Sequence, residues 1–104
     1  MTFNEITSPE SIANRLVWLR EYTGLKKQEF AASINASPSQ LSNWESATNR
    51  LSLDGALQIN ARYGTSLDFL YLGRVETLPQ NMRSAWASRS LDNTSSISID
   101  KSAS

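Results

Sequence analysis

The most informative part of this 104-residue sequence is KKQEFAASINASPSQLSNWES, residues 26–46. Its apolar residues at helical spacing are Phe30, Ala31, Ile34, Leu41 and Trp44. The first three are spaced i, i+1, i+4 and the last two i, i+3, so each group lies on one face of a helix. The segment therefore predicts two short amphipathic helices, over residues 27–34 and 38–46.

A tight turn of three residues, Asn35, Ala36 and Ser37, separates these two helices. Asparagine tolerates the left-handed backbone that ends a helix, and Ser37 followed by Pro38 is a strong signal for the start of one. Two helices joined at an angle by so short a turn form a helix-turn-helix unit, whose second helix lies in the major groove of DNA. The pattern therefore predicts a sequence-specific DNA-binding protein.

Another helix is expected before this unit, over residues 9–23. Thr7 or Ser8 can cap its start, and Thr7 and Glu10 have the spacing of a capping box. Gly24 is a typical stop signal. The apolar stripe of this helix is Ile12, Leu16 and Leu19.

Two helices are expected after the unit. Ser52 can cap the first, which Gly64 ends, and Thr65 or Ser66 can cap the second, LDFLYL, which Gly73 ends. The residues of the first helix expected to face inward are Leu53, Ala56, Leu57 and Tyr63.

The C-terminal part of the chain is weaker in pattern. A helix is expected from Pro79, with Met82 and Trp86 one turn apart. Residues 90–104 are rich in serine and low in large apolar residues, which is typical of a mobile tail. The SISI alternation within them would form a strand only with a partner edge.

These elements predict an all-α fold, a compact five-helix domain with a helix-turn-helix and a polar C-terminal tail. We expect an N-terminal arm at residues 1–7, the DNA-binding domain at 8–75, and the weak helix and tail at 76–104.

Composition narrows the function classes. The chain has no cysteine and no histidine, so it lacks thiolate and imidazole ligands and the usual general base. We therefore expect no enzyme activity, no cofactor and no metal site. No apolar run approaches the roughly 18 residues of a membrane span, and the acidic, polar start is no secretory signal, so a cytoplasmic location without membrane contact is expected.

The formal net charge of zero counts against DNA binding, because nucleic-acid binders are usually basic. The positive charges near the motif are local: Lys26 and Lys27 at its entry and Arg50 just after it. Local charges suffice for phosphate contact, because screening acts over about 8 Å at physiological salt.

The stretch from Arg15 to Gly73 resembles the Cro and lambda-repressor-like (XRE) helix-turn-helix family. The motifs that carry the resemblance are RL-x-x-LR-x-x-x-GL from Arg15, QEFA from Gln28, LSNWE from Leu41 and RYGTSLDFLYLG from Arg62. The resemblance implies a compact five-helix bundle that binds a palindromic double-stranded DNA operator as a homodimer.

Some positions depart from the family pattern. Lys26 and Lys27 stand where the family usually has a polar cap and a glutamine. Asn35 and Ala47 stand where it usually has glycines, and Asn60 replaces a small apolar residue. The first of these departures alters how the DNA backbone would be gripped.

The residues expected to read bases project from the start of the helix at 38–46, and they are Pro38, Ser39, Gln40, Ser42 and Asn43. Asparagine and glutamine can pair bidentately with adenine, and serine can donate or accept. For Gln40 there is an alternative, because Ser37 and Gln40 also have capping-box spacing.

The residues expected to contact phosphates are Lys26, Lys27, Ser37 and Arg50. The resemblance also implies a buried ion pair between Arg20 and Glu45 that would orient the recognition helix. Trp18 and Tyr22 lie one turn apart, and they are either partly buried under the C-terminal tail or part of a partner or dimer surface.

Three functions fit these features. The first is a transcriptional regulator, in particular a repressor of phage or mobile-element type. The second is an antitoxin that represses its own operon while its tail binds a toxin as protein partner. The third is a protein-interaction module of the same fold that has lost DNA binding, which the zero net charge favours.

Overall fold

The computed structural model describes residues 2–89, which form helices and turns without any strand. The helices are α1 (Phe3–Ile6), α2 (Pro9–Thr23), α3 (Lys27–Ser33), α4 (Pro38–Glu45), α5 (Leu53–Tyr63), α6 (Leu67–Leu72), a 3₁₀ turn η1 (Val75–Thr77) and a last helix over residues 80–89. The predicted all-α fold is confirmed. The expectations for residues 90–104, the mobile tail and the SISI strand, lie outside the described residues.

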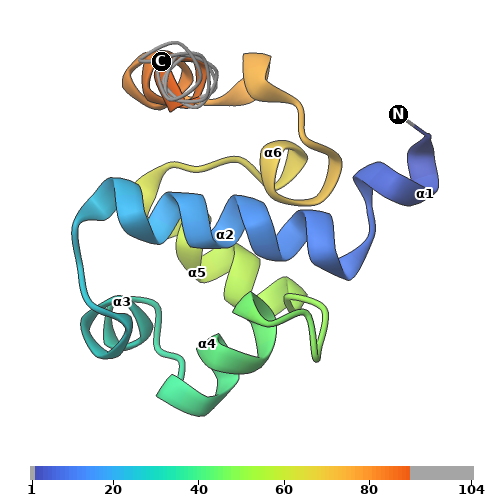
Figure 1. The fold of residues 1–104 in the computed structure, drawn as a ribbon. Coiled ribbons are helices and arrows are strands. Elements are labelled where there is room, and N and C mark those ends of the chain that lie inside the picture. The colour runs from blue at the N-terminus through green and yellow to red at the C-terminus, as the bar shows by residue number, and fades with distance from the viewer. Residues whose placement is uncertain (1, 90–104) are drawn as a thin grey trace, which may run out of the picture.

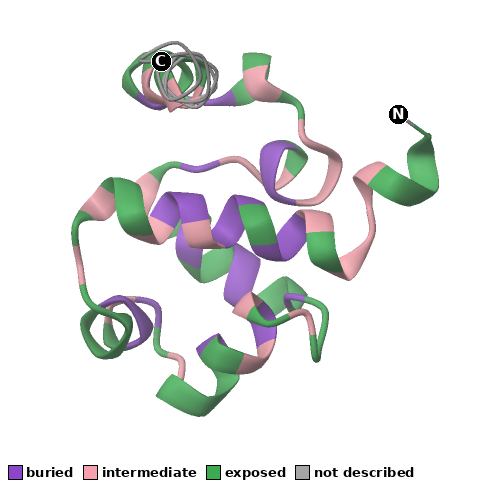
Figure 2. Ribbon diagram, in the orientation of Figure 1, coloured by how far each residue is buried: buried purple, intermediate pink, exposed green. Residues whose placement is uncertain are grey.

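Helix α2 runs through the centre of the molecule (Figure 1). Helices α3 and α4 lie on one side of it, and α6 and the helix at 80–89 lie on the other. Figure 2 shows the buried residues concentrated along α2 and α5. The expected stripe of α2 is buried completely and forms the middle of the core: Ile12, Leu16 and Leu19. Burying such side chains is worth about 1.5–3 kcal/mol each.

Serine side chains begin most of these helices. The Oγ atoms of Ser8, Ser37, Ser52 and Ser66 each accept a hydrogen bond from a backbone N–H of the first turn. Ser8 therefore caps α2, and the expected box between Thr7 and Glu10 is wrong. The hydroxyl of Thr7, which follows α1, instead donates to the carbonyl of Phe3, the first residue of that helix (2.8 Å).

The expectation that Leu53 and Leu57 face inward is wrong. Their exposed fractions are 60% and 49%, whereas Ala56 and Ile59 are fully buried. The physical reason lies at Gly55, where a Cβ atom would come within 2.7 Å of the Trp44 ring. This close approach of α5 to α4 rotates α5 so that its leucines face outward.

The hydrophobic core continues past residue 75, where we expected the domain to end. Leu78 and Met82 are buried, and the Trp86 ring meets Phe69 edge-to-face with 5.0 Å between centroids. Trp86 also lies edge-on to Trp18 at 5.1 Å. Trp18 and Tyr22 were expected to be either partly buried or part of a partner surface. Trp18 is buried, whereas Tyr22, which stacks on it, stays partly exposed.

Candidate nucleic-acid interface

Helices α3 and α4 pack against each other as the predicted helix-turn-helix. The side chains that join them to the core are all buried: Phe30, Ala31, Ile34, Leu41 and Trp44. In the turn, Asn35 adopts a left-handed backbone with φ of 57°, and the Ala36 N–H donates to the Ala31 carbonyl at 2.9 Å. Asparagine thus takes the conformation for which glycine is normally used.

A capping box fixes the start of α4. The Ser37 Oγ accepts from the Gln40 N–H at 3.1 Å, and the Ser37 N–H donates to the Gln40 Oε1 at 2.9 Å. The alternative role weighed for Gln40 is therefore present in the structure. The Ser37 hydroxyl proton is not used in this box, so it can still donate to a phosphate oxygen.

The capping box changes what Gln40 can recognise. Bidentate pairing with adenine needs the amide oxygen as acceptor and the amide nitrogen as donor. The oxygen of Gln40 accepts from Ser37 through one of its two lone pairs, so pairing with adenine would use the other lone pair while the capping box holds. In this conformation the Nε2 group is the less constrained end of Gln40, and it can donate to an acceptor such as guanine O6 or N7 or a phosphate oxygen.

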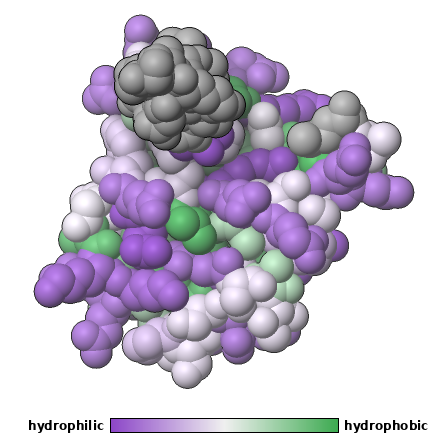
Figure 3. Space-filling model, viewed as in Figure 1, coloured by the Kyte–Doolittle hydropathy of each residue, from purple (hydrophilic) through white to green (hydrophobic). Residues whose placement is uncertain are grey.

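The outward face of α4 carries small uncharged side chains. Pro38, Ser39 and Ser42 are exposed, and Asn43 is half-buried at the edge of the face. Within the described part of the chain, no hydrogen bond involves the side-chain amide of Asn43. Figure 3 shows the contrast: the lower region, where α4 lies, is mostly pale, and strongly hydrophilic residues gather toward α3.

The ion pair expected between α2 and α4 is formed. Arg20 Nε lies 2.8 Å from Glu45 Oε2, and Arg20 Nη2 lies 3.2 Å from Oε1, so the contact is bidentate. The Glu45 side chain is only 4% exposed and that of Arg20 18%. The hydrogen bond to Glu45 raises the pKa of Arg20 above its ordinary value. This pair sets the orientation of α4 against the core.

Glu45 has a second cationic neighbour that the sequence did not reveal. Lys27 Nζ, from the first turn of α3, lies 3.8 Å from Glu45 Oε1 and remains about half exposed. Lys27 is therefore close to both the carboxylate and the solvent. Arg20 already neutralises Glu45, so the positive charge of Lys27 remains in excess beside the outward face of α4.

The other candidate phosphate contacts differ in how far they are engaged. Lys26 is exposed at the N-cap of α3, where its N–H donates to Glu29 Oε1 at 2.9 Å. Arg50 lies in the segment between α4 and α5, and its Nη1 donates to the Thr7 carbonyl. Arg50 is thus bound to the turn between α1 and α2, so a phosphate would compete with that carbonyl.

The end of α4 departs from the usual geometry of alanine. Ala47 adopts a left-handed backbone with φ of 63°, at the position where the resembling family usually has glycine. The Asn49 N–H then donates to the Asn43 carbonyl at 3.1 Å, which closes the turn after the helix. A side chain with a Cβ atom is strained in this conformation.

Among residues 2–89, no three His, Cys, Asp or Glu side chains are grouped in a way that could hold a metal ion. No helix in that same range is both long enough and apolar enough to cross a membrane.

Comparison with known proteins agrees with this geometry. Residues 17–70 match the sequence model of the family described as "Helix-turn-helix". A relative is the "Repressor protein CI" of Enterobacteria phage phi80, with 36% identity over 63 residues. The aligned part is 61% of this chain but 26% of the relative, so the chain spans about a quarter of that protein's length.

No solved structure matches this chain. The family match covers more than half of the chain, and its range contains α3, the turn and α4. The protein is therefore a member of the helix-turn-helix family, in its XRE, lambda-repressor-like branch.

Proposed function

We propose that this protein is a sequence-specific repressor of phage or mobile-element type, which binds double-stranded DNA and reads the major groove with α4. The observation that carries the proposal is the combination at α4: an outward face of small polar side chains on a helix held by the Arg20–Glu45 pair. Base reading requires such fixed donors and acceptors. The direction of regulation rests on the printed name of the phi80 relative.

The distribution of charge supports a division of labour between the two helices. The outward face of α4 has no charged side chain at Pro38, Ser39, Gln40, Ser42 or Asn43. The cations Lys26 and Lys27 stand at the start of α3, so phosphate contacts would come from there, with the Ser37 hydroxyl beside them. With so few cations, we expect weak non-specific binding and a shallow salt dependence, because each phosphate contact adds about 0.9 to the slope.

A homodimer on a palindromic operator is part of the proposal. Leu53 and Leu57 lie one turn apart on α5, and their exposed fractions are 60% and 49%. Leu57 also borders the groove between α4 and α5 that Gln40 and Gln58 line. A second copy of this chain packed on α5 would cover these leucines.

The test is a selection of bound duplexes from a random-sequence pool with the full chain, at roughly 50 and 200 mM salt. We expect an enriched motif with dyad symmetry and half-site centres about 34–36 Å apart, one turn of DNA. Sedimentation of the complex should give two protein chains per duplex. A pool without enrichment at the lower salt, or an asymmetric motif bound by one chain, would contradict the proposal.

One further candidate function has an observation in its favour. The zero net charge favours a protein-interaction module that has kept the fold without binding DNA. The same selection separates the two, because such a module enriches nothing. The antitoxin alternative depends on residues 90–104, which lie outside the described residues.

A further inference from the structure

Helix α5 exposes an apolar row to solvent. The row consists of Leu53, Leu57 and Ala61, which are spaced four residues apart and therefore follow one another along one side of the helix. All three side chains are exposed. The other exposed large apolar residues within 2–89 are Phe3 and Tyr22, and they lie singly on α1 and α2. Two exposed leucines therefore adjoin on α5, which indicates a contact surface rather than scattered apolar residues.

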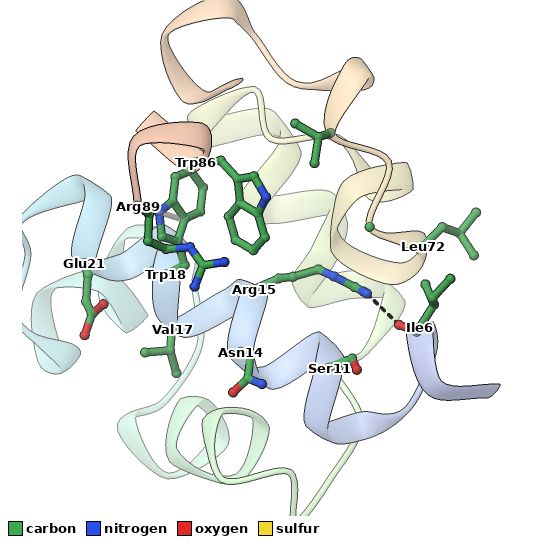
Figure 4. Close-up of a pocket in the computed structure, with 12 residues that line it drawn as sticks. Ile6, Ser11, Asn14, Arg15, Val17, Trp18, Glu21, Leu72, Trp86 and Arg89 are labelled. Carbon is green, nitrogen blue, oxygen red and sulfur yellow. Dashed lines mark hydrogen bonds between the residues drawn. The ribbon is translucent and has the colours of Figure 1, made fainter. Parts of the chain in front are cut away.

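The side of α2 that faces the last helix shows a different situation. There the helix at 80–89 covers α2, as the side chains in Figure 4 show. The Trp86 ring meets Trp18 edge-on at 5.1 Å, and the Arg89 guanidinium lies 4.0 Å from the centre of the Trp86 ring. Among the described residues, no segment covers the row on α5 in this way, because its leucines remain exposed.

A polar row runs beside the apolar one. Its members are Asp54, Gln58 and Arg62, again four residues apart and all exposed. Asp54 lies in the first turn of α5 and Arg62 in the last. Within the part of the chain that the structure describes, neither takes part in an ion pair. The row is thus negative at one end and positive at the other, so it is complementary to a copy of itself that runs in the opposite direction.

We propose that a second copy of this chain packs antiparallel on α5, with the twofold axis at Leu57. Each Leu57 then meets the Leu57 of the other copy, and each Leu53 meets Ala61. Asp54 of each copy comes beside Arg62 of the other, which gives two equivalent ion pairs, as an isologous contact requires. A parallel arrangement would instead bring like charges together. The inference rests on the homodimer of the proposed function and adds its geometry.

The place of α4 agrees with this arrangement. The groove between α4 and α5 is lined by Gln40 and Trp44 from α4 and by Asp54 and Gln58 from α5, so α4 lies on the side of α5 that carries the polar row. The twofold axis between two antiparallel helices is perpendicular to the plane that contains them. Rotation about it keeps that side on the same side. Both copies of α4 therefore lie on one side of the α5 pair, as contact of both with one duplex requires.

The first experiment exchanges the two charges and measures self-association by sedimentation. In Asp54→Arg and in Arg62→Asp, like charges meet in the homodimer, whereas a mixture of the two variants restores opposite charges at both pairs. We expect each variant alone to dissociate at least about tenfold more readily than the equimolar mixture. Glu10→Arg is the matched control, because it reverses an exposed acid in the first turn of α2, and it should leave self-association unchanged.

The second experiment tests the register by disulfide formation, which is simple to interpret because the chain has no cysteine of its own. Leu57→Cys should link to itself, since this position lies at the axis. Leu53→Cys should link to Ala61→Cys in a mixture but not to itself, because the two Leu53 positions lie about 12 Å apart along the helices, beyond the reach of a disulfide. Ser84→Cys, exposed on the last helix, is the control that should stay unlinked.

Three results would overturn this interface: a mixture of the charge variants that stays monomeric, Leu53→Cys linking to itself, or Ser84→Cys linking as fast as Leu57→Cys. The DNA-binding proposal is tested separately, by the duplex selection. A chain that passes both experiments but enriches no duplex would contradict DNA binding and leave the α5 contact in place. A chain that enriches a palindromic motif but fails both experiments would overturn the α5 contact alone.

Discussion

Two arginines on α2, five residues apart, hold the two halves of the molecule in different ways. Arg20 faces α4 and makes a bidentate ion pair with Glu45. Arg15 faces α6 and makes hydrogen bonds to two backbone carbonyls instead. An ion pair between side chains neutralises both charges and fixes one helix against another. Carbonyl partners fix the backbone equally well but leave a positive charge in the protein. The half that contains α3 and α4, which we propose as the DNA-reading half, is thus neutral inside, and the opposite half is cationic inside.

The largest effect is expected on the cationic half. Arg15→Met keeps a long side chain but leaves the carbonyls of Ile6 and Leu70 without their donors, in a buried setting. We expect a loss of about 3–4 kcal/mol of unfolding free energy, because each stranded group costs about 1–3 kcal/mol. Urea denaturation measures it, with Arg83→Met as the control for an exposed arginine. A loss below about 1 kcal/mol would mean that water replaces the guanidinium at these carbonyls.

Substitutions in the Arg20–Glu45 ion pair should lower the free energy of unfolding in a different pattern, because both members can be removed together. Arg20→Ala and Glu45→Ala should each cost about 2–3 kcal/mol, somewhat below the usual 3–5 kcal/mol for a buried pair because Arg20 is 18% exposed. The double variant should cost less than the sum of the two, since neither charge is then stranded. Thermal and urea unfolding of all four proteins give the cycle. Strict additivity would mean that the two side chains do not interact in solution.

The same contrast governs what could be predicted from the sequence. The helix-turn-helix is specified by residues that lie close together in the sequence. They are Asn35 for the left-handed turn, Ser37 and Gln40 for the cap, and Leu41 and Trp44 for the buried face. Each of these signals acts over a few residues, so spacing alone reveals it. The Arg20–Glu45 pair spans a larger separation, and it was expected through the resemblance to a family rather than through spacing.

The features that the sequence did not reveal depend on contacts between distant segments. The outward rotation of Leu53 and Leu57 follows from Gly55 packing against the Trp44 ring, which no pattern within α5 records. The carbonyl partners of Arg15 lie in α1 and α6. In the sequence, Arg15 is notable only as the first residue of the RL-x-x-LR motif. No pattern in the sequence indicated that Lys27 would lie beside Glu45. Tertiary packing decided each of these cases.

Binding experiments can separate the phosphate and base roles assigned to the DNA-reading half. Asn43→Ala should cost about 1–3 kcal/mol of operator affinity and relax preference mainly at one base position. Lys27→Ala should weaken all sequences alike and reduce the salt slope by about one contact. Affinities for the selected operator and for scrambled duplexes, each over a salt series, give both quantities. The reverse pattern would show that the two roles are exchanged.

The smallest expected effect is a gain in stability, and it concerns backbone strain on the DNA-reading half. Ala47 and Asn35 both adopt left-handed backbones, with φ of 63° and 57°. The left-handed conformation costs alanine about 1–2 kcal/mol. Replacement by glycine removes this cost, but part of the gain is offset because glycine loses more chain entropy on folding. Ala47→Gly should therefore raise the free energy of unfolding by about 0.5–1 kcal/mol.

Asn35→Gly is the matched control for this gain. Asparagine tolerates the left-handed region, and its Nδ2 also donates to Gln58 Oε1 at 3.3 Å, so its replacement should yield less than that of Ala47. Urea denaturation at fixed temperature measures both variants. If Ala47→Gly gave no gain or a loss, the turn after α4 would not hold its left-handed conformation in solution. The exit of the recognition helix would then be set by the Asn49 N–H bonding to the Asn43 carbonyl rather than by residue 47.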